Sequence, residues 1–262
     1  MDIPSNVGLA LLLTTIAGLS TGIGSFIAYF IKKPKISYLC FSLGLSAGVM
    51  IYVSFVELIP DALESIGDLW GLYAFFAGII IVGIIDLAIP DIENPHHYEK
   101  CIEKKKGKDV KTDKKLMRVG VFTAFAVAIH NFPEGLATFG ATLSNVELGI
   151  LITFAIAIHN IPEGISVSMP IYYATKSRKK AFIYSALSGF SEPVGAIIGL
   201  IILLPILSDW VLGFLLAFVA GIMVYISADE LIPTAHQYGH GHCAIMGFII
   251  GMFIMAFSLV II

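Results

Sequence analysis

The chain has 262 residues, of which 57% are hydrophobic and only 13% are charged, and its formal net charge at pH 7 is −3. A soluble domain carries about 25% charged residues because it must face water, so this composition excludes an ordinary soluble protein. Apolar runs of about 20 residues, each long enough to cross ~30 Å of hydrocarbon, recur along the chain. We therefore expect an all-α polytopic membrane protein that sits in the lipid bilayer and has no nucleic-acid partner.

Eight transmembrane helices are expected, in chain order, at roughly 5–31, 36–63, 68–89, 116–142, 145–172, 178–206, 209–236 and 240–262. They form a single transmembrane domain over 1–262, with helices 1–3 at 1–89, a loop at 91–115, helices 4 and 5 at 116–172 and helices 6–8 at 178–262. The N-terminus has no basic residue before its apolar run, so it is expected to lead into the first span and not to be a cleaved signal peptide.

The basic residues are confined to three connections. All 16 lysines and arginines lie between helices 1 and 2, between helices 3 and 4, or between helices 5 and 6. With eight spans, these connections share one side of the membrane. The positive-inside rule then predicts that this side is the cytoplasm and that both termini are extracytoplasmic.

The loop at 91–115 is the only long polar segment. It is rich in lysine and carries the pair His96-His97, and we expect it to be mobile or disordered. The three cysteines fit neither a disulfide framework nor a CxxC metal site; they are Cys40, Cys101 and Cys243.

One internal repeat relates the two ends of the chain. Residues 47–62 read AGVMIYVSFVELIPDA and residues 220–235 read AGIMVYISADELIPTA, with ten of sixteen positions identical. The copies lie on helices 2 and 7, which run in opposite directions. This is the pattern of an inverted-topology repeat, here in a 3+2+3 arrangement, and such folds place the substrate near the bilayer midplane between the halves.

A second repeat lies between those halves. Residues 126–135 read AVAIHNFPEG and residues 155–164 read AIAIHNIPEG. His130 lies about 14 residues, or roughly 21 Å, from the start of helix 4. His159 is similarly placed on helix 5, which runs the other way. The two motifs should therefore meet near the middle of the bilayer.

Each motif carries a histidine and a glutamate four residues apart, which places both side chains on one helix face, one turn apart. Imidazole nitrogens and carboxylate oxygens suit zinc, iron, manganese and related divalent ions, and the neighbouring asparagines offer amide oxygens. Helix 6 adds another intramembrane carboxylate. The candidate metal ligands are His130, Asn131, Glu134, His159, Asn160, Glu163 and Glu192.

These residues could instead tie helices together by hydrogen bonds. Interhelical bonds of that kind are worth only ~0.6–2 kcal/mol, whereas a charge at the middle of the bilayer costs more. Because the whole constellation occurs twice and a third carboxylate accompanies it, we favour ion binding.

Other polar and sulfur-containing residues have simpler explanations. Carboxylates near helix ends are expected to snorkel or cap, with a role in the ion pathway as the alternative: Glu57, Asp86, Asp229 and Glu230. Two methionines at matching repeat positions are expected to pack, with soft ligation as the alternative: Met50 and Met223. Surface histidines are often idle but would be placed to collect metal on the cytoplasmic side: His96, His97, His236, His240 and His242.

With its paired HNxPEG motifs, the Glu-Pro of helix 6 and the repeats of helices 2 and 7, the sequence resembles the ZIP family of divalent metal transporters, within it the prokaryotic ZupT-like branch. The resemblance implies a binuclear centre, with one ion held chiefly by the His/Glu pairs and the other by the asparagines and Glu192. It also implies a homodimer of the inner (plasma) membrane that takes up zinc, iron(II), manganese, cobalt or cadmium into the cytoplasm. An elevator-like movement of helices 1, 4, 5 and 6 is implied as well, with no organic cofactor.

Two alternatives remain. An intramembrane metal-dependent enzyme would use the same ligands, but zinc hydrolases of the HExxH kind have a glutamate directly after the first histidine. Here that position is Asn131 or Asn160, which cannot take a proton. A metal-responsive receptor is the other alternative, and the chain has no sizeable soluble signalling domain. We expect a transporter and not an enzyme.

Overall fold

The computed structural model describes residues 4–30, 36–88, 110–237 and 241–261. This part of the chain is helical, contains no strand, and forms the eight expected rods. In chain order they are α1 (Val7–Phe30); α2 (Ile36–Val53) with the π-helical turn η1 (Ser54–Leu58) and α3 (Ile59–Ile66); α4 (Asp68–Ala88); α6 (Val110–Ser144); α7 (Val146–Thr175); α8 (Arg178–Gly189) with α9 (Ser191–Ile198), the π-helical turn η3 (Gly199–Leu203) and the 3₁₀ turn η4 (Leu204–Ile206); α10 (Asp209–Ile226) with the π-helical turn η5 (Ser227–Leu231) and α11 (Ile232–Gln237); and α12 (Gly241–Ile261).

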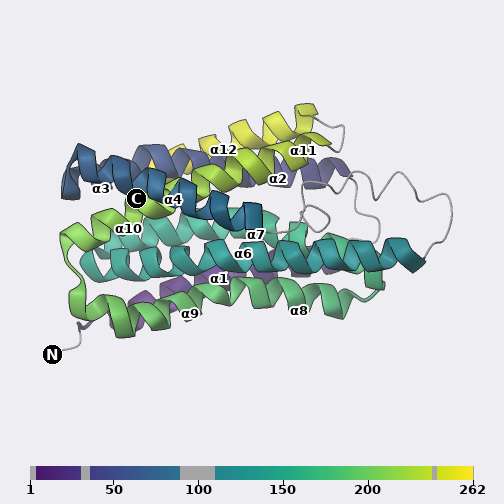
Figure 1. Ribbon diagram of the computed structural model, residues 1–262, viewed down its shortest axis with the longest axis horizontal. Helices are drawn as coiled ribbons and strands as arrows, with labels where there is room; N and C mark the ends of the chain where they lie inside the picture. Colours follow the sequence, from purple (N-terminus) through teal and green to yellow (C-terminus); the bar gives the residue numbers. More distant parts are fainter. Residues whose placement is uncertain (1–3, 31–35, 89–109, 238–240, 262) are drawn as a thin grey trace.

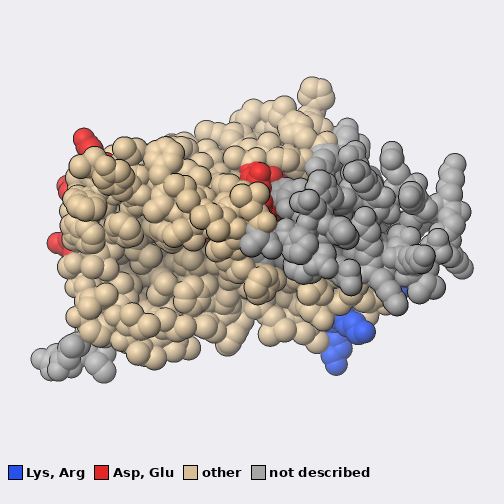
Figure 2. All heavy atoms as spheres, viewed as in Figure 1, with Lys and Arg blue, Asp and Glu red and all other residues tan. Residues whose placement is uncertain are grey.

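Seven of the rods are long and apolar enough to cross a membrane. The exception is α6, which begins with a lysine-rich stretch and carries His130, Asn131 and Glu134 near its middle. Figure 2 shows a broad surface almost free of charged side chains, with acidic groups at its left end, basic groups at its lower right and one further acidic group near the grey atoms. The exposed basic residues that the structure describes lie around the α7–α8 turn: Lys176, Lys179 and Lys180. The chain is a polytopic membrane protein.

The predicted loop is shorter than expected. α6 begins at Val110, so residues 110–115 belong to a helix and not to the loop at 91–115. Three of these six positions are lysines, which are good helix formers, so the helix continues beyond its apolar part. The remaining loop, with His96, His97 and Cys101, lies outside the described residues, as does His240.

Tight turns with caps set the directions of several helices. Only Asn145 separates α6 from α7, and its side chain accepts hydrogen bonds from the backbone N–H groups of Glu147 and Leu148. Ser177 and Ser208 cap α8 and α10 in the same way. Such caps satisfy N–H groups that the first helical turn leaves unpaired, so α6 and α7 become antiparallel neighbours.

The rods pack as two groups of four, which lie in the lower and upper halves of Figure 1. We call the group of α1, α6, α7 and α8–α9 the motif bundle, because it carries both HNxPEG motifs. The group of α2–α3, α4, α10–α11 and α12 is the framework bundle. The two bundles meet along α2 against α7 and along α10 against α6. The start of α1 and the end of α12 lie at the same end of the molecule (Figure 1).

The inverted repeat is visible in the framework bundle as a contact that occurs twice. A Cβ atom on Gly48 would lie 2.1 Å from the backbone oxygen of Phe248, and one on Gly221 would lie 2.0 Å from that of Phe75. Gly221 follows Gly48, and Phe248 follows Phe75, by the offset that separates the AGVM and AGIM segments. Thus α2 packs on α12 as α10 packs on α4.

A π-helical turn also occurs at the same place in each copy. η1 and η5 lie on equivalent residues, and each is followed by a proline at the start of the next helix, Pro60 or Pro233. A proline has no backbone N–H, so it cannot donate a hydrogen bond to the preceding turn. The widened turns therefore recur with the sequence that requires them, which confirms the 3+2+3 inverted-repeat arrangement.

Candidate metal centre

Both HNxPEG motifs lie in the middle of the motif bundle, where α6 and α7 pack side by side. Pro133 and Pro162 are contained within these continuous helices. All seven predicted ligands are buried, with exposed fractions between 0% and 3%. Polar side chains buried so deeply in an apolar belt are rare unless they bind something or each other.

Histidines and glutamates pair across the two helices. Nε2 of His130 lies 3.2 Å from Oε2 of Glu163, and Nε2 of His159 lies 3.3 Å from Oε2 of Glu134. The spacing along one helix had suggested pairs within each motif. Because the helices are antiparallel and face each other, each histidine instead reaches the glutamate of the other copy. The two pairs are equivalent under the repeat.

The carboxylate of Glu192 joins from the first turn of α9. The side-chain amide of Asn160 donates to Oε1 of Glu192 and, at 3.0 Å, to the backbone oxygen of Ala17 in α1. A Cβ on Gly135 would lie 2.2 Å from the backbone oxygen of Glu192, so only a glycine lets α9 approach α6 this closely. The structure therefore brings all three intramembrane glutamates of the motif bundle into one region.

Many polar atoms in this region have no hydrogen-bond partner. Each of the three glutamates leaves one carboxylate oxygen unpaired, and so do the amide oxygen of Asn160, both amide atoms of Asn131 and Nδ1 of His159. A buried polar atom without a partner is unfavourable by about 1–3 kcal/mol. A cation or ordered water bound here would satisfy several of these atoms at once.

The hydrogen-bonded arrangement is not itself a coordination sphere. Among the described residues, no three His, Cys, Asp or Glu side chains form a ready-made metal site. Nε2 of each histidine now points at a carboxylate oxygen. Metal binding would therefore replace the two cross-helix pairs by bonds from the same atoms to the ion.

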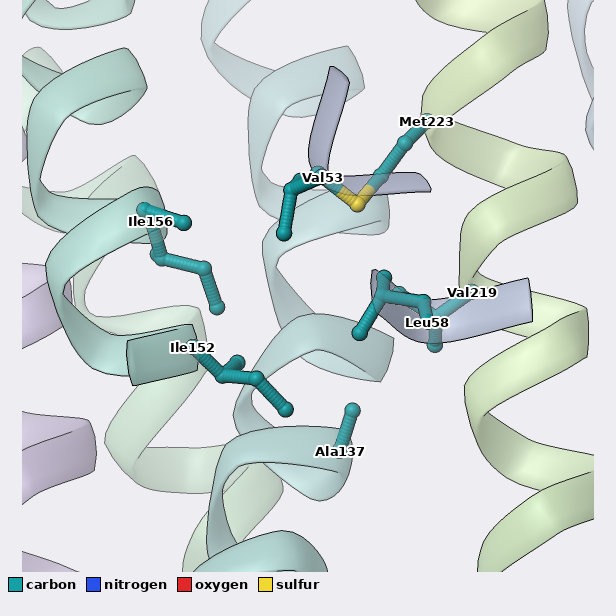
Figure 3. A pocket seen from close by; sticks show the side chains of 8 residues that line it. Val53, Leu58, Ala137, Ile152, Ile156, Val219 and Met223 are labelled. Carbon is teal, nitrogen blue, oxygen red and sulfur yellow. The ribbon is translucent and has the colours of Figure 1, made fainter. Parts of the chain in front are cut away.

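On the side of the centre toward the chain termini, the interface between the bundles is apolar and closed. A cavity of about 10 Å³, near the smallest that could hold one water molecule, is lined from four helices. In Figure 3, Ile152 and Ile156 of α7 face Val219 and Met223 of α10, with Val53, Leu58 and Ala137 between them. No polar side chain lines this cavity.

The framework bundle contributes a hydrogen bond to the centre that the sequence did not suggest. Oγ of Ser46, in α2, donates to the backbone oxygen of His159 at 3.2 Å. This bond joins the two bundles at the level of the motifs. No sequence signal identified Ser46, because a serine inside an apolar helix is common and its rotation toward α7 is set by packing.

Of the remaining candidates, Glu230 lies close enough to interact electrostatically with His130. Met50 and Met223 are buried in the apolar core that the two bundles share, in agreement with packing. Asp86 accepts a hydrogen bond from the hydroxyl of Tyr225 at 3.4 Å, near the ends of α4 and α10. Among the described histidines outside the motifs, His236 and His242 are exposed. Within the described part of the chain, neither Cys40 nor Cys243 takes part in a disulfide.

Comparison with known proteins agrees with this organisation. The family described as ZIP Zinc transporter matches residues 90–259, which include both motifs and Glu192. A zinc transporter ZupT of Clostridium perfringens is 56% identical, with 99% of this chain and 98% of that protein covered. A zinc transporter ZupT of Oceanobacillus iheyensis is 54% identical over 98% of each chain, and one of Streptococcus mutans is 54% identical over 96% of this chain and 97% of that protein.

Similarity of this extent over nearly the whole length decides between the alternatives raised by the sequence. ZIP proteins are transporters and not enzymes, so the intramembrane enzyme is excluded. With its inverted repeat, its two buried motifs and these relatives, the chain belongs to the ZIP family of divalent metal transporters.

Proposed function

We propose that this protein carries zinc across the membrane through the centre formed by the seven buried residues of the motif bundle. The same donor set would accept iron(II), manganese, cobalt and cadmium, since imidazole, carboxylate and amide groups bind most first-row divalent ions. The observation that carries the proposal is the group of unpartnered oxygen and nitrogen atoms around the two cross-helix His–Glu pairs.

Two ions would share the centre. One lies between the two His–Glu pairs, where four side chains converge from α6 and α7. The other is held by Asn131, Asn160 and Glu192, next to the first. A second cation is favoured here because three carboxylates in a buried region repel one another unless positive charge is added.

The charges at the two ends indicate the orientation of the chain, and uptake is the direction that the resemblance to ZIP transporters implies. The described basic residues cluster at the α7–α8 end, which the positive-inside rule assigns to the cytoplasm of the cell. Both termini then lie on the extracytoplasmic side of the inner membrane, and zinc moves inward. In this conformation the apolar side chains of Figure 3 lie between the centre and the terminus-bearing end.

A change of access requires the motif bundle to move against the framework bundle. The interface between them is apolar around the cavity of Figure 3, with the Ser46 hydrogen bond at the level of the centre. Such a surface permits sliding without exposing charges to hydrocarbon. A homodimer and the assignment of the whole chain to one transmembrane domain remain predictions.

Uptake of radioactive zinc into proteoliposomes tests the proposal. The wild-type protein should accumulate zinc, whereas Glu134→Ala and Glu163→Ala should not, although both variants fold and insert. The control is Glu147→Ala, which removes an exposed carboxylate at the start of α7. Normal uptake by both motif variants would disprove the ligand assignment.

A further inference from the structure

The inverted repeat of the motif bundle assigns a counterpart to every residue around Glu192. A Cβ on Gly135 would lie 2.2 Å from the backbone oxygen of Glu192, and one on Gly164 would lie 2.0 Å from that of Thr21. Gly135 and Gly164 are the closing glycines of the two motifs. Thr21 of α1 therefore stands where the repeat has Glu192 in α9.

Three further contacts have the same symmetry. A Cβ on Gly195 would lie 2.4 Å from the oxygen of Phe132, and one on Gly24 would lie 1.9 Å from that of Ile161. Phe132 and Ile161 are the same motif position. Gly18 and Gly189 approach each other's backbone oxygens, within 2.5 Å and 2.3 Å of the added Cβ atoms. Each α1 residue and its counterpart in α8–α9 differ by the same offset as Thr21 and Glu192.

The asparagines show what the exchange of glutamate for threonine changes. Asn160 is tied down by Glu192 and by the backbone of Ala17. Its counterpart Asn131 has no partner for either amide atom, although it is completely buried. The hydroxyl of Thr21, also completely buried, has no partner either. A threonine side chain is two bonds shorter than that of glutamate, so it cannot repeat the bond that holds Asn160.

We propose that Thr21 is a specificity-determining residue of the metal centre, whose hydroxyl and the Asn131 amide oxygen bind the ion, directly or through one bound water, on the side facing α1. This inference rests on the proposed zinc-binding function of the centre. In this assignment the centre has an acidic side chain, Glu192, on the α9 side and a neutral one, Thr21, on the α1 side. With carboxylates at both positions, the centre would hold a divalent ion more tightly and release it more slowly.

The neutral oxygens also influence the choice of metal. Oxygen donors such as carboxylates, carbonyls and water suit manganese, whereas zinc also accepts imidazole well. Removing the Thr21 hydroxyl leaves the histidines in place and takes away only an oxygen donor. The affinity for manganese should therefore fall more than the affinity for zinc.

The test measures binding of zinc and manganese to the full-length protein in lipid nanodiscs. Thr21→Val keeps the shape of the side chain and removes the hydroxyl. Thr21→Ser keeps the hydroxyl and removes the methyl group. Thr14→Val is the matched control, because Thr14 is equally buried on the same helix but already donates to the backbone oxygen of Ala10 at 2.9 Å.

We expect Thr21→Val to weaken zinc binding about fivefold to tenfold, the range of one hydrogen bond or ligand contact, and to weaken manganese binding further. Thr21→Ser and Thr14→Val should bind both metals as the wild type does. Equal affinities for Thr21→Val and Thr14→Val would overturn the proposal. Equal weakening by Thr21→Ser and Thr21→Val would also overturn it, because packing of the methyl group would then explain the effect.

Two further variants separate a failure of the Thr21 proposal from a folding defect and from a failure of the proposed function. If Thr21→Val does not insert, Thr21→Ala replaces it, and the proposal stands only if alanine weakens binding and serine does not. Glu134→Ala is measured in parallel: if the wild type binds no zinc, or if Glu134→Ala binds it normally, the proposed function fails and this inference fails with it. A loss confined to Glu134→Ala refutes the role of Thr21 alone.

Discussion

The two bundles use the same inverted symmetry for different purposes. In the framework bundle, the repeated glycines Gly48 and Gly221 let helices pack backbone against backbone, and the repeated alanines and methionines lie in the apolar core. In the motif bundle, the repeated positions are histidines, asparagines and glutamates, many of which have unpaired atoms. The comparison suggests that one bundle is a rigid support and the other holds the ion, and the predictions below aim to break or sharpen that division.

The largest difference should appear between carboxylates of the two bundles. Glu163→Ala removes a ligand and one member of a cross-helix pair, so zinc uptake should fall at least about 100-fold, since even outer-shell changes at metal sites cost 10–100-fold. Glu57→Ala, in the half-buried π turn of the framework bundle, should reduce initial uptake rates less than threefold. Comparable losses in proteoliposome uptake would mean that the framework bundle also binds the ion.

Glycine contacts offer a second comparison. Gly48→Ala places a methyl group 2.1 Å from the backbone oxygen of Phe248, and Gly135→Ala places one 2.2 Å from that of Glu192. Backbone atoms cannot move aside easily, so each change should lower the free energy of unfolding by about 1–3 kcal/mol. Only Gly135→Ala should also weaken zinc binding, because it displaces the backbone that carries a ligand.

Thermal unfolding in detergent and zinc titration of the folded protein measure these two effects separately. Gly8→Ala is the control, since an added methyl group there meets nothing within 4 Å. Zinc affinity that falls equally in Gly48→Ala and Gly135→Ala would show that the bundles are not independent.

The hydrogen bond between the bundles should have a smaller effect. Ser46→Ala removes the bond to the backbone oxygen of His159 and should lower the free energy of unfolding by about 0.5–1.5 kcal/mol. Ser65→Ala removes an exposed bond within α3 and should change it by less than about 0.5 kcal/mol. Chemical denaturation in detergent compares the two variants. Equal losses of unfolding free energy would argue against a stabilising hydrogen bond between the bundles at Ser46.

The smallest effect on stability and uptake is expected for Met223, which lines the apolar cavity between the bundles. Met223→Leu conserves the side-chain volume and should cost less than about 1.5 kcal/mol of stability, with zinc uptake unchanged. Uptake assays with zinc and with the softer ion cadmium would detect a thioether ligand. A selective loss of cadmium uptake in this variant would contradict the packing role.

Much of this division could be predicted from the sequence. Apolar runs, the confinement of lysine and arginine to three connections, and the two internal repeats together specify eight helices and their directions. Spacing within the HNxPEG motifs identifies which side chains share a helix face. These are properties of single helices and of the order of elements, which a sequence states directly.

What the sequence did not provide are the contacts that depend on how helices are rotated against each other. The cross-helix pairing of His130 with Glu163, the bond from Ser46 and the close approach at Gly48 all require the packed structure. Thr21 went unnoticed because its equivalence to Glu192 appears only in the repeated glycine contacts.

The central claim is that zinc binds to the buried residues of the motif bundle. X-ray absorption at the zinc edge, recorded on the protein in nanodiscs, tests it most directly. The account predicts nitrogen and oxygen neighbours at about 2.0–2.2 Å with an imidazole contribution, lost in the Glu134→Ala, Glu163→Ala double variant. An unchanged spectrum in that variant, or sulfur at about 2.3 Å, would contradict it.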